Sequence, residues 1–185
     1  FTTDAAKDSY YGESRLFHLR WGAGSTMGTE TGALELPKAG PIHDAAWNPL
    51  GTSFVVIAGK SPPAATLFSD RGKPLHQFGV KARNTACWSP GGRYLLLAGF
   101  GNMAGEMEFY QLRLDPKTKR QTAVSIGLAD GSGTHRMSWS RDGRYLLVAT
   151  TFPRLRVDNG VRIFSHRGGS PVAVSYTHLR AHETD

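Results

Sequence analysis

The chain has 185 residues, 39% of them hydrophobic and 20% charged, which is enough to bury a core and argues against a disordered protein. No apolar run approaches the roughly 18 residues that a membrane-spanning helix needs, so a membrane protein is not expected. The net charge of +7 and the pI near 9.8 make polyanions, RNA above all, candidate partners. The basic residues are scattered, however, and a surplus of surface Lys and Arg explains the same composition equally well.

The first part of the chain, residues 1–39, is predicted to be the end of a sheet unit followed by a connecting loop. Residues 13–19 match the aromatic-containing third strand of the repeats described next, and residues 32–37 match their fourth strand. A polar loop rich in Gly and Thr, residues 22–31, separates the two.

Three copies of one template follow, and each predicts a four-stranded sheet. In each copy a strand ends on a tryptophan, a tight turn brings a glycine four residues later, and an apolar strand, an aromatic-containing strand and a weaker fourth strand come next. The tryptophans are Trp47, Trp88 and Trp139, and the turn glycines are Gly51, Gly92 and Gly143. A period of roughly 40–50 residues built from short strands is typical of β-propeller blades.

The predicted fold is therefore all-β, a partial β-propeller with about three complete four-stranded blades plus part of an earlier blade. The blades are expected at residues 40–80, 81–130 and 131–174. Propellers mostly close with about four to eight blades, so we expect the chain to be a fragment of a longer propeller. Residues 175–185 break the pattern and are predicted to be a non-native tail.

Each element of the repeat has a physical reason. Glycine in the turn supplies a positive φ without steric cost. The continuous apolar runs at 94–98 and 145–149 indicate strands buried on both faces, as between neighbouring blades. Because the tryptophans recur with the repeat, we expect them to pack in the core rather than to stack on bases.

Five stretches resemble a known family, the eukaryotic translation initiation factor 2A family, over roughly residues 7–174. Two of them, at 98–102 (Ala-Gly-Phe-Gly-Asn) and 153–160 (Pro-Arg-Leu-Arg-Val-Asp-Asn-Gly), are the most specific, because generic propellers do not carry them. The other three are at 10–13, 40–44 and 83–86. The alternative is a propeller scaffold like the b-type component of initiation factor 3, or another protein-interaction propeller.

The resemblance implies a non-catalytic, cytoplasmic propeller that acts in early translation initiation. It implies binding to the RNA and protein of the small ribosomal subunit, and help in delivering initiator tRNA, in part through regions outside this chain. Messenger RNA is a further RNA partner to consider. No membrane, small-molecule substrate or cofactor is implied.

The residues themselves predict no catalytic, cofactor or metal site. Gly99, Gly101 and Gly105 lack the spacing of a dinucleotide-binding loop, so we interpret them as a loop that needs small residues. His43 and His135 occupy equivalent positions four residues before a tryptophan, where a hydrogen bond within the blade is favoured over catalysis. The single cysteine, Cys87, allows no internal disulfide and is expected to be a small core residue.

The candidate RNA or ribosome contacts are basic residues in connections between strands. Arg154 and Arg156, two apart in an extended stretch, could face phosphate oxygens together, although an ion pair with Asp158 is an equal alternative. Lys81 and Arg83 lie in the connector before a blade. The group Lys117, Lys119 and Arg120 is better explained as a solvated turn.

Overall fold

The structure is a computed structural model and describes residues 3–4, 13–20, 29–117, 121–151 and 159–176. All regular structure in these ranges is β-strand, and three four-stranded antiparallel sheets contain most of it. Within each sheet the strands pair in the order in which they follow along the chain. This is the architecture of propeller blades, and it confirms the predicted all-β partial propeller.

The strands of the three blades follow in chain order. Blade 1 consists of β5 (Ile42–Trp47), β6 (Ser53–Ala58), β7 (Ala64–Ser69) and β8 (Pro74–Val80). Blade 2 consists of β9 (Thr85–Trp88), β10 (Tyr94–Ala98), β11 (Glu106–Leu114) and β12 (Gln121–Asp130). Blade 3 consists of β13 (Arg136–Trp139), β14 (Tyr145–Thr150), β15 (Gly160–Ser165) and β16 (Ala173–Tyr176).

The N-terminal residues contribute two small sheets. Strands β3 (Phe17–Arg20) and β4 (Thr29–Ala33) form an antiparallel pair, and β1 (Thr3–Asp4) pairs with β2 (Glu13–Ser14). At the other end, β16 pairs with β15 through Ser175 and Tyr176. The strand pairing therefore continues two residues into the segment that the sequence suggested was a non-native tail, and residues 177–185 of that segment lie outside the described ranges.

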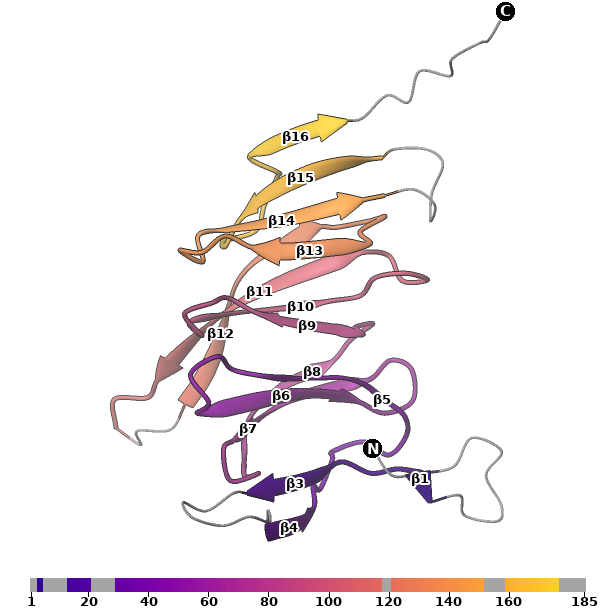
Figure 1. Ribbon diagram of the computed structural model, residues 1–185, viewed down its shortest axis with the longest axis vertical. Coiled ribbons are helices and arrows are strands. Elements are labelled where there is room, and N and C mark those ends of the chain that lie inside the picture. The colour runs from indigo at the N-terminus through magenta and orange to yellow at the C-terminus, as the bar shows by residue number, and fades with distance from the viewer. Residues whose placement is uncertain (1–2, 5–12, 21–28, 118–120, 152–158, 177–185) are drawn as a thin grey trace, which may run out of the picture.

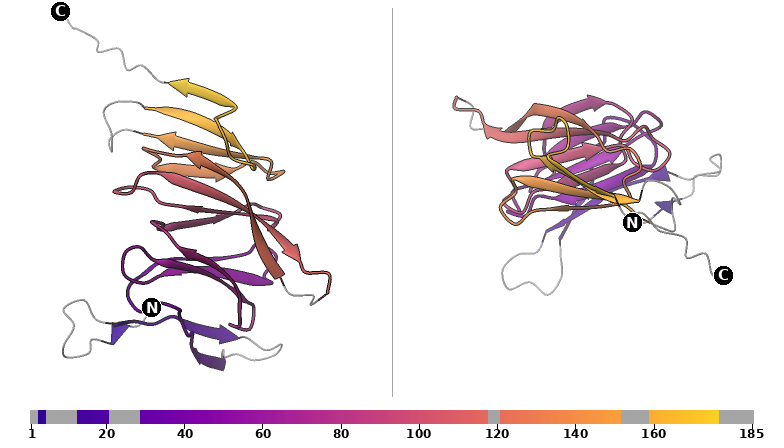
Figure 2. Two further views of the ribbon diagram at one scale, coloured as in Figure 1. Left: turned by 180° about the vertical axis from the view of Figure 1, so that it is seen from behind. Right: turned by 90° about the horizontal axis from the view of Figure 1, so that it is seen from above.

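The blades stack face to face, so the molecule is elongated and its termini lie near opposite ends (Figures 1 and 2). One apolar cluster joins blades 1 and 2 through side chains such as Val55, Leu67 and Leu95. A second cluster joins blades 2 and 3 through side chains such as Leu96 and Phe109. Each core is thus shared by two sheets and could not be built by either alone.

The second strand of a blade is buried on both faces only where a blade lies on each side of it. Every residue of β6 is buried, and in β10 all but Tyr94 are. In β14 Tyr145 and Leu147 are exposed, because their face points away from blade 2 and no described strand covers it. The prediction of two buried faces holds for 94–98 and is wrong for 145–149.

The repeat tryptophans pack against the preceding blade. Trp88 is 8% exposed, and its indole N–H donates to the carbonyl of Ala46 in blade 1 at 3.0 Å. Trp139 lies against the cluster of blade 2, with its ring 6.0 Å from that of Phe109. Trp47 is 51% exposed, which corrects the expectation of core packing for it. Its described N-terminal neighbours are β3 and β4, which supply no inner strands for the indole to cover.

Two polar side chains of blade 1 also bind backbone groups of blade 2. Asp44 accepts a hydrogen bond from the amide of Ala86 at 2.7 Å. The buried Asn48 donates to the carbonyl of Gly92 at 2.9 Å. Both bonds connect the first strands or their turns, so they fix the position of blade 2 relative to blade 1.

The turn glycines have the backbone that the sequence predicts. Gly51, Gly92 and Gly143 have φ values of +69°, +66° and +66°. Gly92 is also constrained by space, since a Cβ atom there would lie 2.2 Å from Oδ1 of Asn48.

We expect Gly92→Ala to lower the free energy of unfolding by about 2–4 kcal/mol, from left-handed backbone strain and from displacing a buried amide. Gly91→Ala is the matched control, because no atom lies within 4 Å of its Cβ position, and a change below about 0.5 kcal/mol is expected. Urea denaturation of both variants measures the difference. Equal stabilities would show that the turn adapts freely.

Candidate functional site

The antiparallel strand order places two kinds of connection at the same end of every blade. These are the loop from the second to the third strand and the link from the fourth strand to the next blade. We call this end the loop end (Figure 1). Both family-specific stretches, at 98–102 and 153–160, fall in second-to-third-strand connections.

A side chain four residues before each tryptophan binds the residue twelve positions after it. Nε2 of His43 lies 2.9 Å from the carbonyl oxygen of Gly59, and Nδ1 of His135 lies 3.0 Å from the hydroxyl of Thr151. In blade 2 the amide of Asn84 donates to the carbonyl of Phe100 at 2.9 Å and accepts from its N–H at 3.0 Å. Each bond fastens the start of the loop to the start of the blade. The structure therefore gives His43 and His135 the predicted hydrogen bonds within a blade.

A pocket opens at the loop end between blades 2 and 3, with a volume of about 400 Å³. It is lined by residues 84–85 from the start of blade 2, 100–103 from the β10–β11 loop, and 134–137 from the start of blade 3. The family-specific stretch at 98–102 therefore forms one wall of it.

The walls of this pocket are held by backbone contacts that need glycine. The amide of Gly105 donates to the carbonyl of Gly99 at 2.9 Å, and the amide of Gly131 donates to the carbonyl of Gly105 at 2.8 Å. A Cβ at Gly99 would lie 2.2 Å from the carbonyl oxygen of Ala82, and one at Gly105 would lie 2.4 Å from the backbone of Ser132. These close approaches support the interpretation of the glycines as a loop that needs small residues. They also preform the pocket.

The lining combines a cation, amides and apolar groups. Arg136 and Asn102 are exposed, and none of the described lining residues carries a carboxylate. Phe100, Met103 and Met137 are partly buried and supply a ring and two thioethers. Thr134 is buried, and its hydroxyl has no hydrogen-bond partner among the described residues. The pocket thus suits a ligand that has both an anionic group and a flat apolar part.

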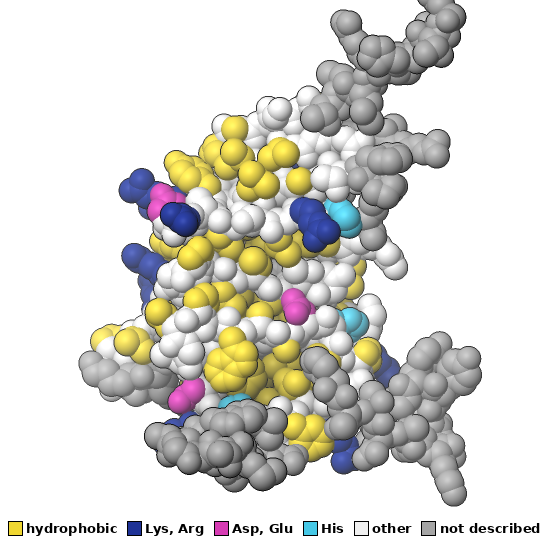
Figure 3. Space-filling model, viewed as in Figure 1, with side chains coloured by type: hydrophobic (Ala, Val, Ile, Leu, Met, Phe, Trp, Pro, Cys, Tyr) yellow, Lys and Arg dark blue, Asp and Glu magenta, His cyan; other side chains and the backbone are white. Residues whose placement is uncertain are grey.

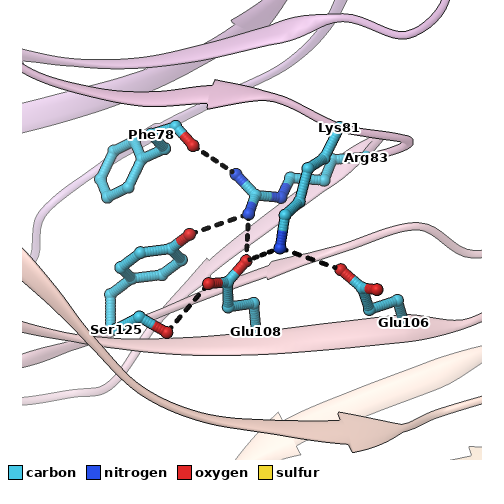
Figure 4. Close-up of polar contacts among 7 residues, drawn as sticks. Phe78, Lys81, Arg83, Glu106, Glu108 and Ser125 are labelled. Carbon is cyan, nitrogen blue, oxygen red and sulfur yellow. Dashed lines mark hydrogen bonds and ion pairs between the residues drawn. The ribbon is translucent and has the colours of Figure 1, made fainter.

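Lys81 and Arg83 lie in a charged cluster between blades 1 and 2 (Figure 4). The guanidinium of Arg83 donates to the carboxylate of Glu108, to the Tyr110 hydroxyl at 2.8 Å and to the carbonyl of Phe78 at 3.4 Å. Nζ of Lys81 lies 2.7 Å from Glu108 and 3.4 Å from Glu106, as Figure 4 shows. The Ser125 hydroxyl donates to the second Glu108 oxygen at 2.9 Å.

The cluster shifts the titration of its members. Burial raises the pKa of Glu108, but hydrogen bonds from Lys81, Ser125 and Tyr110 and the charge of Arg83 outweigh it, so the pKa is lowered. The hydrogen bond to Glu108 raises the pKa of Lys81. Burial raises the pKa of Tyr110 far above its ordinary value, so its hydroxyl stays protonated. All three groups hold the charge state that favours the contacts.

This placement corrects the candidate contacts. Arg83 is 2% exposed and paired with Glu108, so no face of it is open to a phosphate, and its role is structural. Lys81 is exposed but already paired with two carboxylates. Arg154 and Arg156 lie outside the described residues, as do Lys119 and Arg120. Figure 3 shows the Lys and Arg side chains of one face as separate groups rather than one dense patch.

Sequence reasoning missed the pocket and Arg136. The β10–β11 loop was singled out only as a family-specific stretch and as a glycine pattern. Its partner segment, residues 134–137, lies more than thirty positions later along the chain. The available signal was the repeat itself, because equivalent positions of neighbouring blades face each other at the loop end.

Two further classes of site are absent from the described ranges. No three or more His, Cys, Asp or Glu side chains there come together as a metal-binding group. Those ranges also contain no helix long and apolar enough to cross a bilayer.

Fold and packing thus define a blade-stacked propeller with a loop-end pocket. Comparison with known proteins shows the family: the model for "Eukaryotic translation initiation factor eIF2A" matches residues 1–180, and the chain belongs to this family. It is 41% identical over 172 residues to eukaryotic translation initiation factor 2A of Saccharomyces cerevisiae, covering 92% of this chain and 25% of that protein. The chain therefore spans about a quarter of such relatives.

Other matches are more distant. The b-type component of eukaryotic translation initiation factor 3 from Lodderomyces elongisporus is 31% identical over 121 residues, covering 63% of this chain and 16% of that protein. A crystal structure of a eukaryotic initiation factor superposes with a TM-score of 0.69 at 28% identity, covering 88% of this chain and 42% of that one. The β-propeller domain of Cps50 from Myceliophteria thermophila (TM-score 0.59, 12% identity, 91% of this chain and 55% of that one) shares the fold. These relatives identify a translation initiation factor and point to a non-enzymatic role.

Proposed function

We propose that this chain is a non-catalytic docking propeller that binds the small ribosomal subunit and helps deliver initiator tRNA in the early steps of initiation. The observation that carries the proposal is the family match over nearly the whole chain. The net charge of +7 supports an RNA component in the interface. A cytoplasmic location follows from this role.

Arg154 and Arg156 remain the proposed ribosome contacts, because they fall in the connection between β14 and β15, at the same end of the blade as the pocket. Replacing both with alanine should weaken co-sedimentation with purified small subunits. If each meets one phosphate, the slope of log affinity against log salt should fall by about two.

The matched control is Arg71→Ala with Arg141→Ala. It removes the same charge from exposed turns at the opposite end of the blades. It should leave affinity and salt slope nearly unchanged. A loop-end double variant that melts early and binds normally per folded molecule would instead assign Arg154 and Arg156 a structural role.

A second candidate is a protein-interaction scaffold, favoured by the match to the b-type component of initiation factor 3. Binding dominated by protein contacts would be much less sensitive to salt than binding to phosphates. The same salt series therefore separates the two candidates.

A further inference from the structure

We propose that the loop-end pocket between blades 2 and 3 binds one unpaired nucleotide of an RNA strand, with the base against Phe100 and the phosphate at Arg136. The proposal deepens the proposed function and rests on it for the choice of RNA among anionic ligands. It concerns described residues alone and does not depend on Arg154 or Arg156.

The shape of the pocket fits a single nucleotide. Its volume of about 400 Å³ lies in the range typical of small-ligand sites, and a duplex would not enter it. Its walls are set by the glycine contacts between the β10–β11 loop and residues 131–132. The backbone of Phe100 is fixed by both groups of the Asn84 amide. A preformed pocket loses little freedom on binding.

The chemistry of the lining matches the parts of a nucleotide. The Phe100 ring and the thioethers of Met103 and Met137 offer apolar surface to the faces of a base. The exposed Asn102 amide carries a donor and an acceptor, as the edge of a base requires. The Thr134 hydroxyl lines the pocket and is buried without a partner among the described residues, which leaves it available to a ligand.

The charge of the pocket favours an anion. Arg136 is exposed, and no described carboxylate pairs with it. The nearby Arg162 donates to the carbonyls of Asp130, at 3.3 Å, and Ser132, which places a second guanidinium beside the same loop. An acidic peptide would satisfy Arg136 but would leave the ring and both thioethers unmatched. A nucleotide uses both halves of the lining.

The test is fluorescence anisotropy with a short, labelled, single-stranded RNA of mixed sequence, its duplex form, and a labelled poly-glutamate peptide. The unmodified chain should bind the single strand, with much weaker binding of the duplex and the peptide. Phe100→Leu should weaken binding about tenfold at unchanged salt slope, since stacking is lost and charge is kept. Arg136→Gln should reduce the salt slope by about one.

Because Phe100 also touches the blade 2–3 core, Asn102→Ala serves as a second pocket variant on an exposed side chain. It should weaken RNA binding at an unchanged melting temperature. Arg71→Gln, at the opposite end of blade 1, is the charge-matched control and should bind normally.

Unchanged RNA affinity in folded Phe100→Leu, Asn102→Ala and Arg136→Gln would overturn the proposal. So would binding of the peptide through Arg136 with no binding of RNA. If the pocket variants lose the oligonucleotide but ribosome co-sedimentation of the unmodified chain fails, the inference stands and the proposed function falls. If co-sedimentation succeeds and no oligonucleotide binds, the proposed function stands and the inference falls.

Discussion

Trp88→Ala is expected to lower the free energy of unfolding by about 3–5 kcal/mol, the usual cost of truncating a buried large aromatic. The indole is 8% exposed and belongs to the cluster that joins blades 1 and 2. Truncation also leaves the carbonyl of Ala46 without its indole partner. Because the lost contacts cross between blades, the cooperativity of unfolding should fall as well. Guanidinium denaturation followed by circular dichroism measures both quantities.

Trp47→Ala is the matched control, since it removes the same side chain from the same position of the repeat. Trp47 is 51% exposed, and its main described contact is the ring of Phe54 at 4.7 Å between centroids. We therefore expect a loss of only about 1–2 kcal/mol. Equal losses for Trp47→Ala and Trp88→Ala would contradict the view that each tryptophan is stabilised by the blade before it.

The sequence predicted the parts of the fold that local chemistry decides. The Trp-to-Gly interval set the first turn of every blade, because the glycine backbone there must have a positive φ. The clamps of His43 and His135 were also predictable, since they repeat with the blade. The exposure of Trp47 and of one face of β14 was not, because burial there depends on which blade lies alongside.

The role of Arg83 shows the limit for site residues. A basic residue in a connector suggests a surface contact, but its partner Glu108 lies in the third strand of the same blade. One signal was present in the sequence: Glu106, Glu108 and Tyr110 alternate along one strand and so share a face. Polar groups on one face of a strand that packs against another blade require buried partners, and Arg83 and Lys81 supply them.

Glu108→Gln is expected to destabilise the chain by about 3–5 kcal/mol, because it leaves the Arg83 guanidinium buried without its counter-charge. Replacing both residues at once, Arg83→Met with Glu108→Met, removes the charges together and should recover most of the loss. A double-mutant cycle in urea measures the coupling. Additive losses would show that the two side chains act independently.

The pH dependence of stability gives a separate test of the same pair. The pKa of Glu108 is lower in the folded chain than its ordinary value of 4.5. Its contribution is therefore fully present above that value, and it is lost as the pH falls through the lower folded pKa. We expect the stability of the unmodified chain to fall in this acid range and that of Glu108→Gln to fall less, so the two curves should converge. Parallel curves from neutral to acid pH would show that the Glu108 carboxylate is not what holds Arg83 between the blades.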